Sequence, residues 1–467
     1  MDISTIFEVI YINETCPHMM IKFLGAAGTV TGSSMLLTSE SSESILIDCG
    51  MFQGTQATEA FNYAALTVDP STFIGVVLTH AHLDHCGRLP LLTKYGFNKF
   101  IWMTPPTSDI TAISLYDTAK ISRERVGGPI YTEADVDRTI SLFKTVEYDT
   151  KFTIGPFEVM FKDAGHIIGS ASVEVIDTSG KQGSNKIAFS GDLGNSPEPL
   201  IRATEPITSA DFVVVESTYG DRLHPKGRPQ DKIQREIEEI EKSGGVLLIP
   251  AFSIERSQEL LHIVSHLKKS GKIKADTEVV FDGPMGAKVT AVFEKYRGYY
   301  NQELTDDMKE SDPFRFPGLN NIEKYQDSVN EVNTGGPKVV IAGSGMMSGG
   351  RIMEYALRFL PIASTRILFV GYQAEGTLGR KILEGQKLVH IKGVSVAVNA
   401  IVGETQAMSS HADQTGLLSW LKQIKGLKKV IVEHGEDTAR NVFANKIEVD
   451  LGIHDIAIPH LGDEISL

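Results

Sequence analysis

The sequence predicts an α/β fold in which a second α/β unit interrupts the first. Short β-branched and apolar runs, such as Ile45–Ile47 and Val76–Leu78, end at polar or glycine-rich turns, and helical stretches follow several of them. This style stops near Ser217 and resumes after about residue 396. With 42% hydrophobic and 22% charged residues, the composition excludes disordered, collagen-like and disulfide-stapled chains.

The elements of the first unit follow one another in a regular order. Buried strands are expected at Ile21–Leu24, Ile45–Ile47, Val76–Leu78, Ile187–Phe189 and Phe212–Val215. Helices are expected at Arg88–Tyr95, Ser108–Ile121 and Tyr131–Phe143. These elements place the first part of one domain at 20–215, and residues 1–19 are interpreted as an N-terminal extension.

The second unit is expected at 216–395 as a small sheet with flanking helices. Its predicted helices are Gln230–Ser243 and Ile254–Lys269, and its predicted strands are Gly245–Pro250, Glu278–Phe281, Lys338–Ala342 and Arg366–Val370. The acidic, proline-containing stretch 303–318 is predicted to be a loop. Strands at Val394–Val398 and Val430–Val432 resume the first style, so residues 396–467 are expected to complete the first domain.

Charge and cysteine usage limit the partners and the compartment. The net charge of −14 opposes nucleic-acid binding, but residues 217–400 are close to neutral and can tolerate a polyanion. Cys16, Cys49 and Cys86 lie far apart, which indicates thiols in a reducing compartment and hence a cytoplasmic protein. Because no apolar run reaches about 18 residues, no membrane-spanning helix is expected. The acidic N-terminus is not typical of a signal peptide.

The strongest chemical signal is the run T-H-A-H-L-D-H-C-G directly after a strand. It places His80, His82, Asp84 and His85 within six residues. Imidazole and carboxylate ligands suit divalent first-row metals, whereas packing these groups together without a metal would leave polar groups unsatisfied. A short loop can direct His80 and His82 at one ion while Asp84 and His85 face a second.

Three further residues follow apolar runs, as His80 does, and each of the three has a glycine beside it. They are His166 in A-G-H-I-I-G, Asp192 in S-G-D-L-G and His434 in V-E-H-G-E. The full set assigns His80, His82 and His166 to one ion, Asp84, His85 and His434 to the other, and Asp192 to a bridge. Two ions about 3.5–4 Å apart suit an in-line displacement at phosphorus. Asp48 in L-I-D-C-G is interpreted as an acceptor that orients the ligand loop, or as a turn residue.

These residues resemble the motifs of a known family. Asp48, the H-x-H-x-D-H run, His166 and Asp192 resemble the four motifs of the metallo-β-lactamase fold. Glu216 (V-E-S-T-Y-G), His411 (M-S-S-H-A-D) and His434 resemble motifs A, B and C of its β-CASP branch. From about Met20 onward the chain is similar to bacterial and archaeal RNA-processing nucleases, and to the endonuclease subunit of the eukaryotic mRNA 3′-end processing complex.

The resemblance implies an αββα sandwich with an inserted β-CASP domain, two zinc ions and a ribonuclease active site between the domains. It also implies that Asp84 and Asp48 support catalysis, that His411 protonates the leaving 3′ oxygen and that Glu216 holds its ring. A carboxylate that fixes an imidazole in this way keeps its proton available. Histidine at motif C, here His434, is typical of members that act on RNA.

Two segments of the second unit are candidates for phosphate binding. In G-S-G-M-M-S-G-G-R, backbone N–H groups near Gly345 and Ser348, together with Arg351, can accept a phosphate, although a glycine-rich turn that only allows close packing is the alternative. Arg256 in A-F-S-I-E-R-S either reaches phosphates or pairs with Glu255 or Glu259. Arg380 in G-T-L-G-R is equally ambiguous.

The function predicted from the sequence is therefore a two-zinc ribonuclease of RNA processing or decay. A DNA nuclease of the same family, a small-molecule metallo-hydrolase and an inactive RNA-binding scaffold are the alternatives. The RNA target and the balance of endo- and exonuclease action are not specified. A homodimer and RNA-processing partner proteins are both compatible with the chain.

Overall fold

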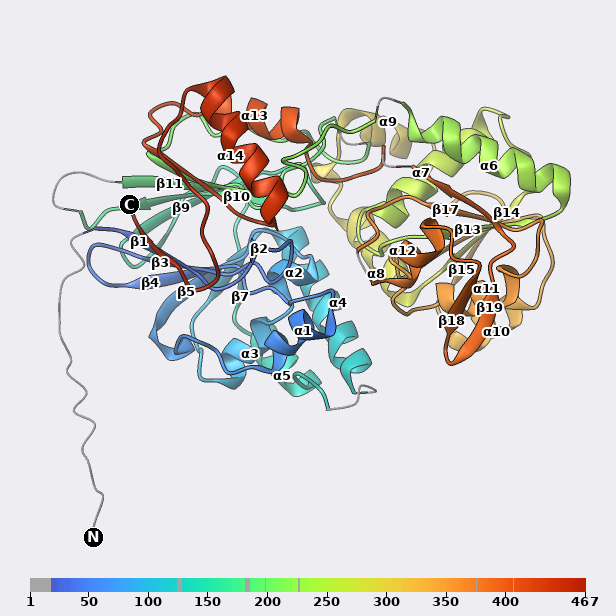
Figure 1. The fold of residues 1–467 in the computed structure, drawn as a ribbon, viewed down its shortest axis with the longest axis horizontal. Coiled ribbons are helices and arrows are strands. Elements are labelled where there is room, and N and C mark those ends of the chain that lie inside the picture. Colours follow the sequence, from blue (N-terminus) through green and yellow to red (C-terminus); the bar gives the residue numbers. More distant parts are fainter. Residues whose placement is uncertain are drawn as a thin grey trace, which may run out of the picture.

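The computed structural model describes residues 18–467 apart from 124–127, 181–184 and positions 198, 226, 375 and 406. Cys16 and nearly all of the predicted N-terminal extension lie outside the described residues. The described chain forms two lobes, and the inserted segment makes up the one coloured from yellow-green to orange in Figure 1. The predicted α/β sandwich with an inserted α/β domain is confirmed.

The first lobe contains two seven-stranded sheets packed face to face. In spatial order the first consists of β24 (Glu464–Ser466), β1 (Met20–Phe23), β3 (Met35–Thr38), β4 (Ser44–Ile47), β5 (Phe73–Val77), β6 (Ile101–Met103) and β7 (Phe143–Thr145). The second consists of β23 (Ile456–Ala457), β21 (Lys429–Val432), β12 (Phe212–Val215), β11 (Asn185–Phe189), β10 (Ala171–Asp177), β9 (Phe157–Asp163) and β8 (Phe152–Ile154). Alternating side chains such as Phe161, Val173 and Ile45 fill the core between them.

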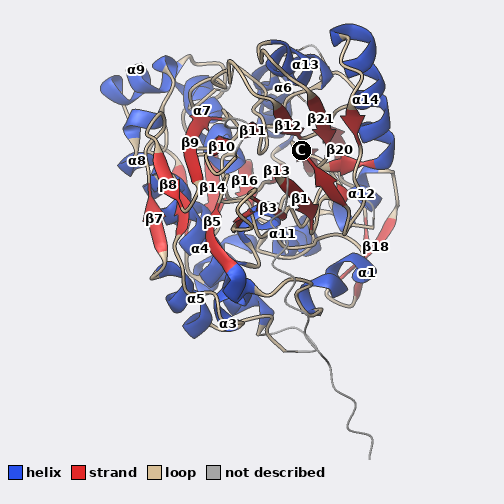
Figure 2. Ribbon diagram, turned by 90° about the vertical axis from the view of Figure 1, so that its left-hand side faces the viewer, coloured by secondary structure: helices blue, strands red, loops and turns tan. Residues whose placement is uncertain are grey.

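Helices cover the outer faces of both sheets, which completes the four layers seen in Figures 1 and 2. The first sheet is covered by α2 (Leu83–Cys86), α3 (Leu89–Lys94), α4 (Pro105–Ser122) and α5 (Glu133–Ile140), with α1 (Gln56–Glu59) nearby. The second sheet is covered by α13 (Gln414–Lys422) and α14 (Asp437–Leu451). A short parallel pair, β2 (Ala27–Gly28) with β22 (Gly435–Glu436), joins the two halves of the domain.

The inserted domain is built on a six-stranded parallel sheet. Its order is β15 (Leu319–Ile322), β14 (Glu278–Asp282), β16 (Lys338–Ala342), β13 (Val246–Pro250), β17 (Arg366–Phe369) and β20 (Ile401–Glu404). Its helices are α6 (Pro229–Ser243), α7 (Arg256–Lys269), α8 (Pro284–Lys295), α9 (Gln302–Glu310), α10 (Tyr325–Val332), α11 (Ile352–Phe359) and α12 (Leu378–Leu383). A hairpin of β18 (Leu388–Ile391) and β19 (Val394–Ala397) packs on the same core.

Two sequence-based expectations for this domain are wrong. The strand at Val394–Val398 does not return to the first domain, since β19 pairs with β18 and the following β20 adds to the inserted sheet beside β17. The inserted sheet therefore extends past the expected boundary at residue 395. The stretch 303–318 is not all loop, because Asn301 caps α9 by accepting a hydrogen bond from the backbone N–H of Leu304.

The two domains share one apolar core. Ile167, Ile168 and Ile201 of the first domain belong to the same buried cluster as Ile254 and Leu260 of the inserted domain. Polar contacts border it: Lys295 Nζ lies 2.6 Å from Asp109 Oδ2, and the Asn301 N–H donates to the Leu200 carbonyl at 3.0 Å. Packing of this kind holds the domains in a defined arrangement.

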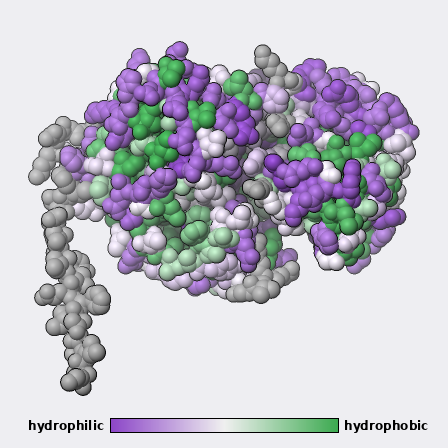
Figure 3. Space-filling model, in the orientation of Figure 1, coloured by the Kyte–Doolittle hydropathy of each residue, from purple (hydrophilic) through white to green (hydrophobic). Residues whose placement is uncertain are grey.

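The surface is predominantly hydrophilic over both lobes on the face drawn in Figure 3. Within the described part of the chain, none of the helices combines the length and the apolar character that crossing a bilayer requires.

The helix α9 depends on a single apolar anchor. Leu304 is its only buried residue in the described structure. We expect Leu304→Ala to destabilise α9 by about 2–4 kcal/mol, because a fully buried leucine is lost, and to accelerate amide hydrogen exchange across 302–310. The exposed Lys309→Ala on the same helix is the control. Equal exchange in both variants would contradict this anchoring.

Candidate metal centre

The chemically active side chains lie just beyond the ends of strands at one edge of the sandwich. Asp48 follows β4, His80 follows β5, Asp192 follows β11 and Glu216 follows β12, while His434 follows β21. Since β11, β12 and β21 run parallel, their carboxyl ends lie at the same edge. The sheets thereby bring together residues that lie up to several hundred positions apart.

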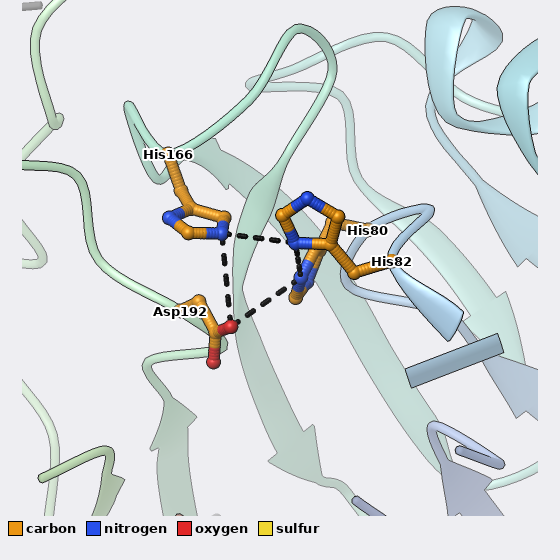
Figure 4. A group of neighbouring side chains, drawn as sticks. All are labelled: His80, His82, His166 and Asp192. Carbon is orange, nitrogen blue, oxygen red and sulfur yellow. Dashed lines mark hydrogen bonds and ion pairs between the residues drawn. The ribbon is translucent and has the colours of Figure 1, made fainter. Parts of the chain in front are cut away.

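The first group of potential ligands consists of His80, His82, His166 and Asp192, which point toward a common centre (Figure 4). His82 Nδ1 lies 3.2 Å from His80 Nε2 and 3.1 Å from His166 Nε2. Asp192 Oδ2 lies 3.4 Å from His80 Nε2 and 3.7 Å from His166 Nε2. Atoms bound about 2.1 Å from a tetrahedral zinc lie about 3.4 Å apart, so this group has the dimensions of a zinc site.

The second group consists of Asp84, His85, His434 and again Asp192. His85 Nε2 lies 3.1 Å from His434 Nε2 and 3.3 Å from Asp192 Oδ1. Asp84 Oδ2 completes the group at 3.8 Å from His434 Nε2. The two oxygens of Asp192 are thus divided between the groups, Oδ2 facing the first and Oδ1 facing the second.

The side chain of Asp192 provides a direct test of whether these groups fit a metal. Both of its oxygens are buried, and neither has a hydrogen-bond partner among the described residues. A buried carboxylate without hydrogen bonds is costly unless a cation compensates it. The residues present therefore fit divalent metal ions on either side of Asp192.

Neighbouring groups orient the imidazoles so that the remaining nitrogens face the centre. His85 Nδ1 lies 2.7 Å from Asp48 Oδ2, and His166 Nδ1 donates to the Ser410 carbonyl at 3.0 Å. The Thr79 hydroxyl lies 2.8 Å from Asp48 Oδ2 and 3.0 Å from His80 Nδ1. Groups of this kind select the tautomer whose other nitrogen carries the lone pair for a metal. Asp48 thus orients a ligand and belongs to neither ligand group.

Burial also favours the neutral, metal-binding form of the first group. It lowers the pKa of His80 and of His82 to about 3 and that of His166 well below the usual range. Burial alone would raise the pKa of Asp192, but nearby imidazoles, above all His434 and His85, hold it well below its usual range. The first group therefore offers neutral imidazoles beside an ionised carboxylate.

His411 and Glu216 form a pair beside the first ligand group. His411 Nδ1 lies 3.3 Å from each oxygen of Glu216, and its Nε2 lies 3.9 Å from Asp192 Oδ2. Glu216 is held in turn by the backbone N–H of Leu193 at 2.7 Å. Burial lowers the pKa of His411, but the carboxylates of Glu216 and Asp192 outweigh it and raise the value to about 9.

The structure does not bring all of the predicted phosphate-binding residues to this centre. Arg351 is engaged within the inserted domain, where it donates to the carbonyls of Glu323 and Lys324 and lies 3.7 Å from Asp282. Gly345 and Ser348 lie in the loop that precedes it. The Arg380 Nε donates to Glu384 at 2.6 Å and the side chain is partly exposed.

A cavity between the domains adjoins the His411 loop. It has a volume of about 370 Å³ and is lined by Asn195 and Met408–Ser409 on one side and by Arg228 and Arg256 on the other. Arg256 is buried and forms an ion pair with Glu259, which resolves one of the pairings left open by the sequence.

Several supporting residues escaped the sequence analysis. His224, which belongs to no motif, donates from Nε2 to the carbonyl of His411 at 2.8 Å. Tyr219 lies with its ring centroid 6.1 Å from that of His411. Thr79 directly precedes His80 and lies outside the H-x-H-x-D-H motif. Only the structure, in which its hydroxyl lies between Asp48 and His80, indicates its role.

Three family models match the chain. They are the metallo-β-lactamase superfamily over residues 27–233, the Beta-Casp domain over 257–382 and the Zn-dependent metallo-hydrolase RNA specificity domain over 395–459.

Curated relatives match over nearly the whole chain. Ribonuclease TTHA0252 of Thermus thermophilus is 37% identical, with 90% of this chain and 94% of the relative covered. The RNase J-like protein of Methanocaldococcus jannaschii is 31% identical, with 92% and 95% covered. Transcription termination factor FttA of Cenarchaeum symbiosum is 31% identical, with 90% and 67% covered.

A solved structure shares the fold. It is a protein of unknown function from Enterococcus faecalis, with a TM-score of 0.54 and 11% sequence identity, covering 96% of this chain and 100% of that chain.

The hydroxyl of Thr79 offers a test of how the ligands are oriented. We expect Thr79→Val to weaken zinc binding about 10–100-fold, because His80 Nδ1 loses the acceptor that fixes its tautomer. Competition with a chromophoric chelator measures the affinity. Thr365→Val is the matched control, since Thr365 is also fully buried but its hydroxyl has no hydrogen-bond partner among the described residues. Equal zinc affinities in the two variants would refute the role of Thr79.

Proposed function

Because the chain belongs to the metallo-β-lactamase β-CASP ribonuclease family, we propose that it hydrolyses RNA phosphodiester bonds with two zinc ions in RNA processing or decay. The observation that carries this proposal is the division of the Asp192 oxygens between two groups of ligands, directly beside His411. A site for two ions next to a proton donor suits an in-line displacement at phosphorus.

The two groups support a ligand set for each ion. His80, His82 and His166 would hold one ion, Asp84, His85 and His434 would hold the other, and Asp192 would contribute to both. Bound there, the ions supply positive charge for the phosphate oxygens and lower the pKa of the attacking water. The residues of the chain orient the substrate and manage the proton of the leaving group.

His411 is the general acid in this proposal. The water oxygen, having lost a proton to solvent, forms a bond to phosphorus as the bond to the 3′ oxygen breaks, and the His411 Nε2–H gives its proton to that 3′ oxygen. Glu216 supports this role because its carboxylate faces His411 Nδ1, which leaves Nε2 directed toward the ligand groups. A carboxylate behind the ring stabilises the protonated form and keeps the proton on the imidazole until it is needed.

Exposed aromatic residues favour a single-stranded polynucleotide as the substrate. Phe252 and Tyr372, 40% and 45% exposed, follow β13 and β17 at the carboxyl edge of the inserted sheet. Burial, followed by the carboxylate of Glu436, raises the pKa of Tyr372. Unpaired bases stack on such side chains.

A further aromatic side chain, Tyr219, lies with its ring centroid 6.1 Å from that of His411, and the Arg222 guanidinium lies 5.8 Å from the Tyr219 centroid. Arg228, exposed at the cavity beside the His411 loop, is the candidate for a phosphate contact, whereas Arg256 is buried and paired with Glu259. The net charge of −14 gives no long-range attraction for a polyanion, so RNA binding should depend on local cationic contacts and weaken as the salt concentration rises.

RNA is proposed over DNA because the match to the RNA specificity domain and the ribonuclease among the relatives support it.

The cytoplasm is the proposed location, since Cys49 and Cys86 are buried free thiols that suit a reducing compartment. A homodimer and processing-partner proteins stay predictions from the sequence.

The role of His411 has a direct kinetic test. We expect His411→Ala to retain zinc and RNA binding but to lose cleavage by about 10²–10⁴-fold, since only the proton donor is removed. Single-turnover cleavage of end-labelled RNA measures the loss, and zinc analysis and filter binding check the rest. The control is His390→Ala on the β18–β19 hairpin, an exposed histidine of the inserted domain. Cleavage by His411→Ala at the parent rate would refute the assignment.

The substrate is tested by parallel digestion of matched single-stranded RNA and DNA oligonucleotides. We expect cleavage of RNA in the presence of zinc and little cleavage of DNA. Comparing end-labelled with internally labelled RNA also separates endo- from exonuclease products. Equal or faster cleavage of DNA would overturn the proposed substrate while leaving the metal centre and His411 in place.

A further inference from the structure

A second group of metal-binding side chains lies in the inserted domain, apart from the active site. His262 and His266 are one turn apart on α7, and Glu303 and Asp307 are one turn apart on α9. Residues spaced i, i+4 share a helix face, and here the two faces meet. One ligand atom from each of the four residues lies within 4.8 Å of the others.

The contacts converge on one oxygen. His262 Nε2 and His266 Nε2 each lie 2.7 Å from Asp307 Oδ2, and the two imidazole centroids are 4.4 Å apart. The carboxylate of the exposed Glu303 also faces the group. Two imidazoles and two carboxylates form a ligand set that suits zinc.

The negative charge of two carboxylates meets two imidazoles at this position. His262 is buried and Asp307 is largely covered, whereas Glu303 is exposed. A divalent ion compensates this charge and uses the imidazole lone pairs at the same time.

We propose that His262, His266, Glu303 and Asp307 bind a structural zinc ion that joins α7 to α9. This site is separate from the proposed catalytic centre and contributes nothing to its ligands. Zinc bound by four protein side chains has no open position and serves to hold the elements together.

The position of the two helices indicates what the ion stabilises. Glu255, at the N-terminus of α7, accepts a hydrogen bond from the backbone N–H of Ile168 at 3.1 Å. Asn301, at the N-terminus of α9, donates its backbone N–H to the Leu200 carbonyl at 3.0 Å. Both helices thus contact the first domain, and α9 has only Leu304 as a buried residue in the described structure. Joining them by zinc fixes the two contact points relative to each other.

The test is zinc content of the full chain after zinc loading and extensive dialysis against zinc-free buffer, measured by inductively coupled plasma mass spectrometry. Asp307→Asn should carry one zinc ion fewer per chain than Asp306→Asn. Asp306 is the matched control because it is the exposed neighbour on the same helix and contacts Gln302 and Lys309 instead. Equal zinc content in the two variants would overturn the proposal.

His266→Gln, compared with the exposed His454→Gln, provides a second pair because the partly exposed position 266 tolerates substitution. A zinc ion lost from the parent protein on dialysis, with no difference within either pair, would show an adventitious ion only. In an Asp192→Ala background, which removes the proposed bridge, we expect one remaining zinc that disappears when Asp307→Asn is added. Because the comparison is a difference of one ion, it stays valid even if the catalytic centre holds fewer than two.

Hydrogen exchange provides a readout that is independent of metal counting. Chelation should accelerate amide exchange at 302–310 in Asp306→Asn and leave Asp307→Asn unchanged, since that variant has no ion to lose. The same response to chelation in both variants would contradict a zinc link between the helices.

Discussion

The arrangement of the candidate metal centre at the edge of the two sheets depends on one buried carboxylate, that of Asp192. Neither of its oxygens has a hydrogen-bond partner among the described residues, and imidazole nitrogens surround it at 3.3–3.9 Å. The chain reaches this position through Gly191, at a φ of +55°, where a Cβ would lie 2.9 Å from the Ala171 carbonyl oxygen. Cations beside a carboxylate held in this way offset the cost of burying its charge. The supporting groups, such as Asp48 and the Ser410 carbonyl, direct the imidazole lone pairs toward that position.

The inserted domain supplies none of these ligands, yet it positions one of them. Glu255 connects it to the backbone two residues after His166, and Ile167 and Ile168 enter the apolar core that both domains share. Glu255 adopts a φ of +62°, a conformation that non-glycine residues seldom adopt and that the surrounding packing must maintain. The loop that presents His166 is therefore held from both domains. Movement of one domain against the other would alter this ligand before it altered His80 or His85.

The structure places His411, the proposed general acid, beside the ligand groups and orients it through a separate carboxylate. His411 lies on the loop before α13, and its ring is fixed by Glu216 at the end of β12. Its Nε2 is 3.9 Å from Asp192 Oδ2, farther than the Nε2 atoms of His80 and His166. The cavity beside this loop is bounded by the inserted domain. The cavity is therefore the space in which the proposed function would place RNA beside His411.

Local sequence patterns predict much of the fold and of the candidate site. The predicted strands before Asp48, His80, Asp192 and Glu216 exist because β-branched runs and the turns after them are short-range signals. The residue types in the run from His80 to His85 are enough to predict metal ligands. His434 was predicted to lie at the same edge of the sandwich because it also follows a strand. Here local pattern and chemistry point to the same site.

Only the tertiary structure decided how distant segments pair. The polar composition of 303–318 predicted a loop, but Leu304 and the Asn301 cap make its first part α9. Likewise β20 joins the inserted sheet through hydrogen bonds to β17, which no local pattern encodes. The partner of Arg256 and the meeting of His262 with Asp307 also depend on how helices pack. Side-chain partners far apart in the chain are selected by the free energy of the whole packed core, whereas strand ends and ligand runs are selected by their own residues.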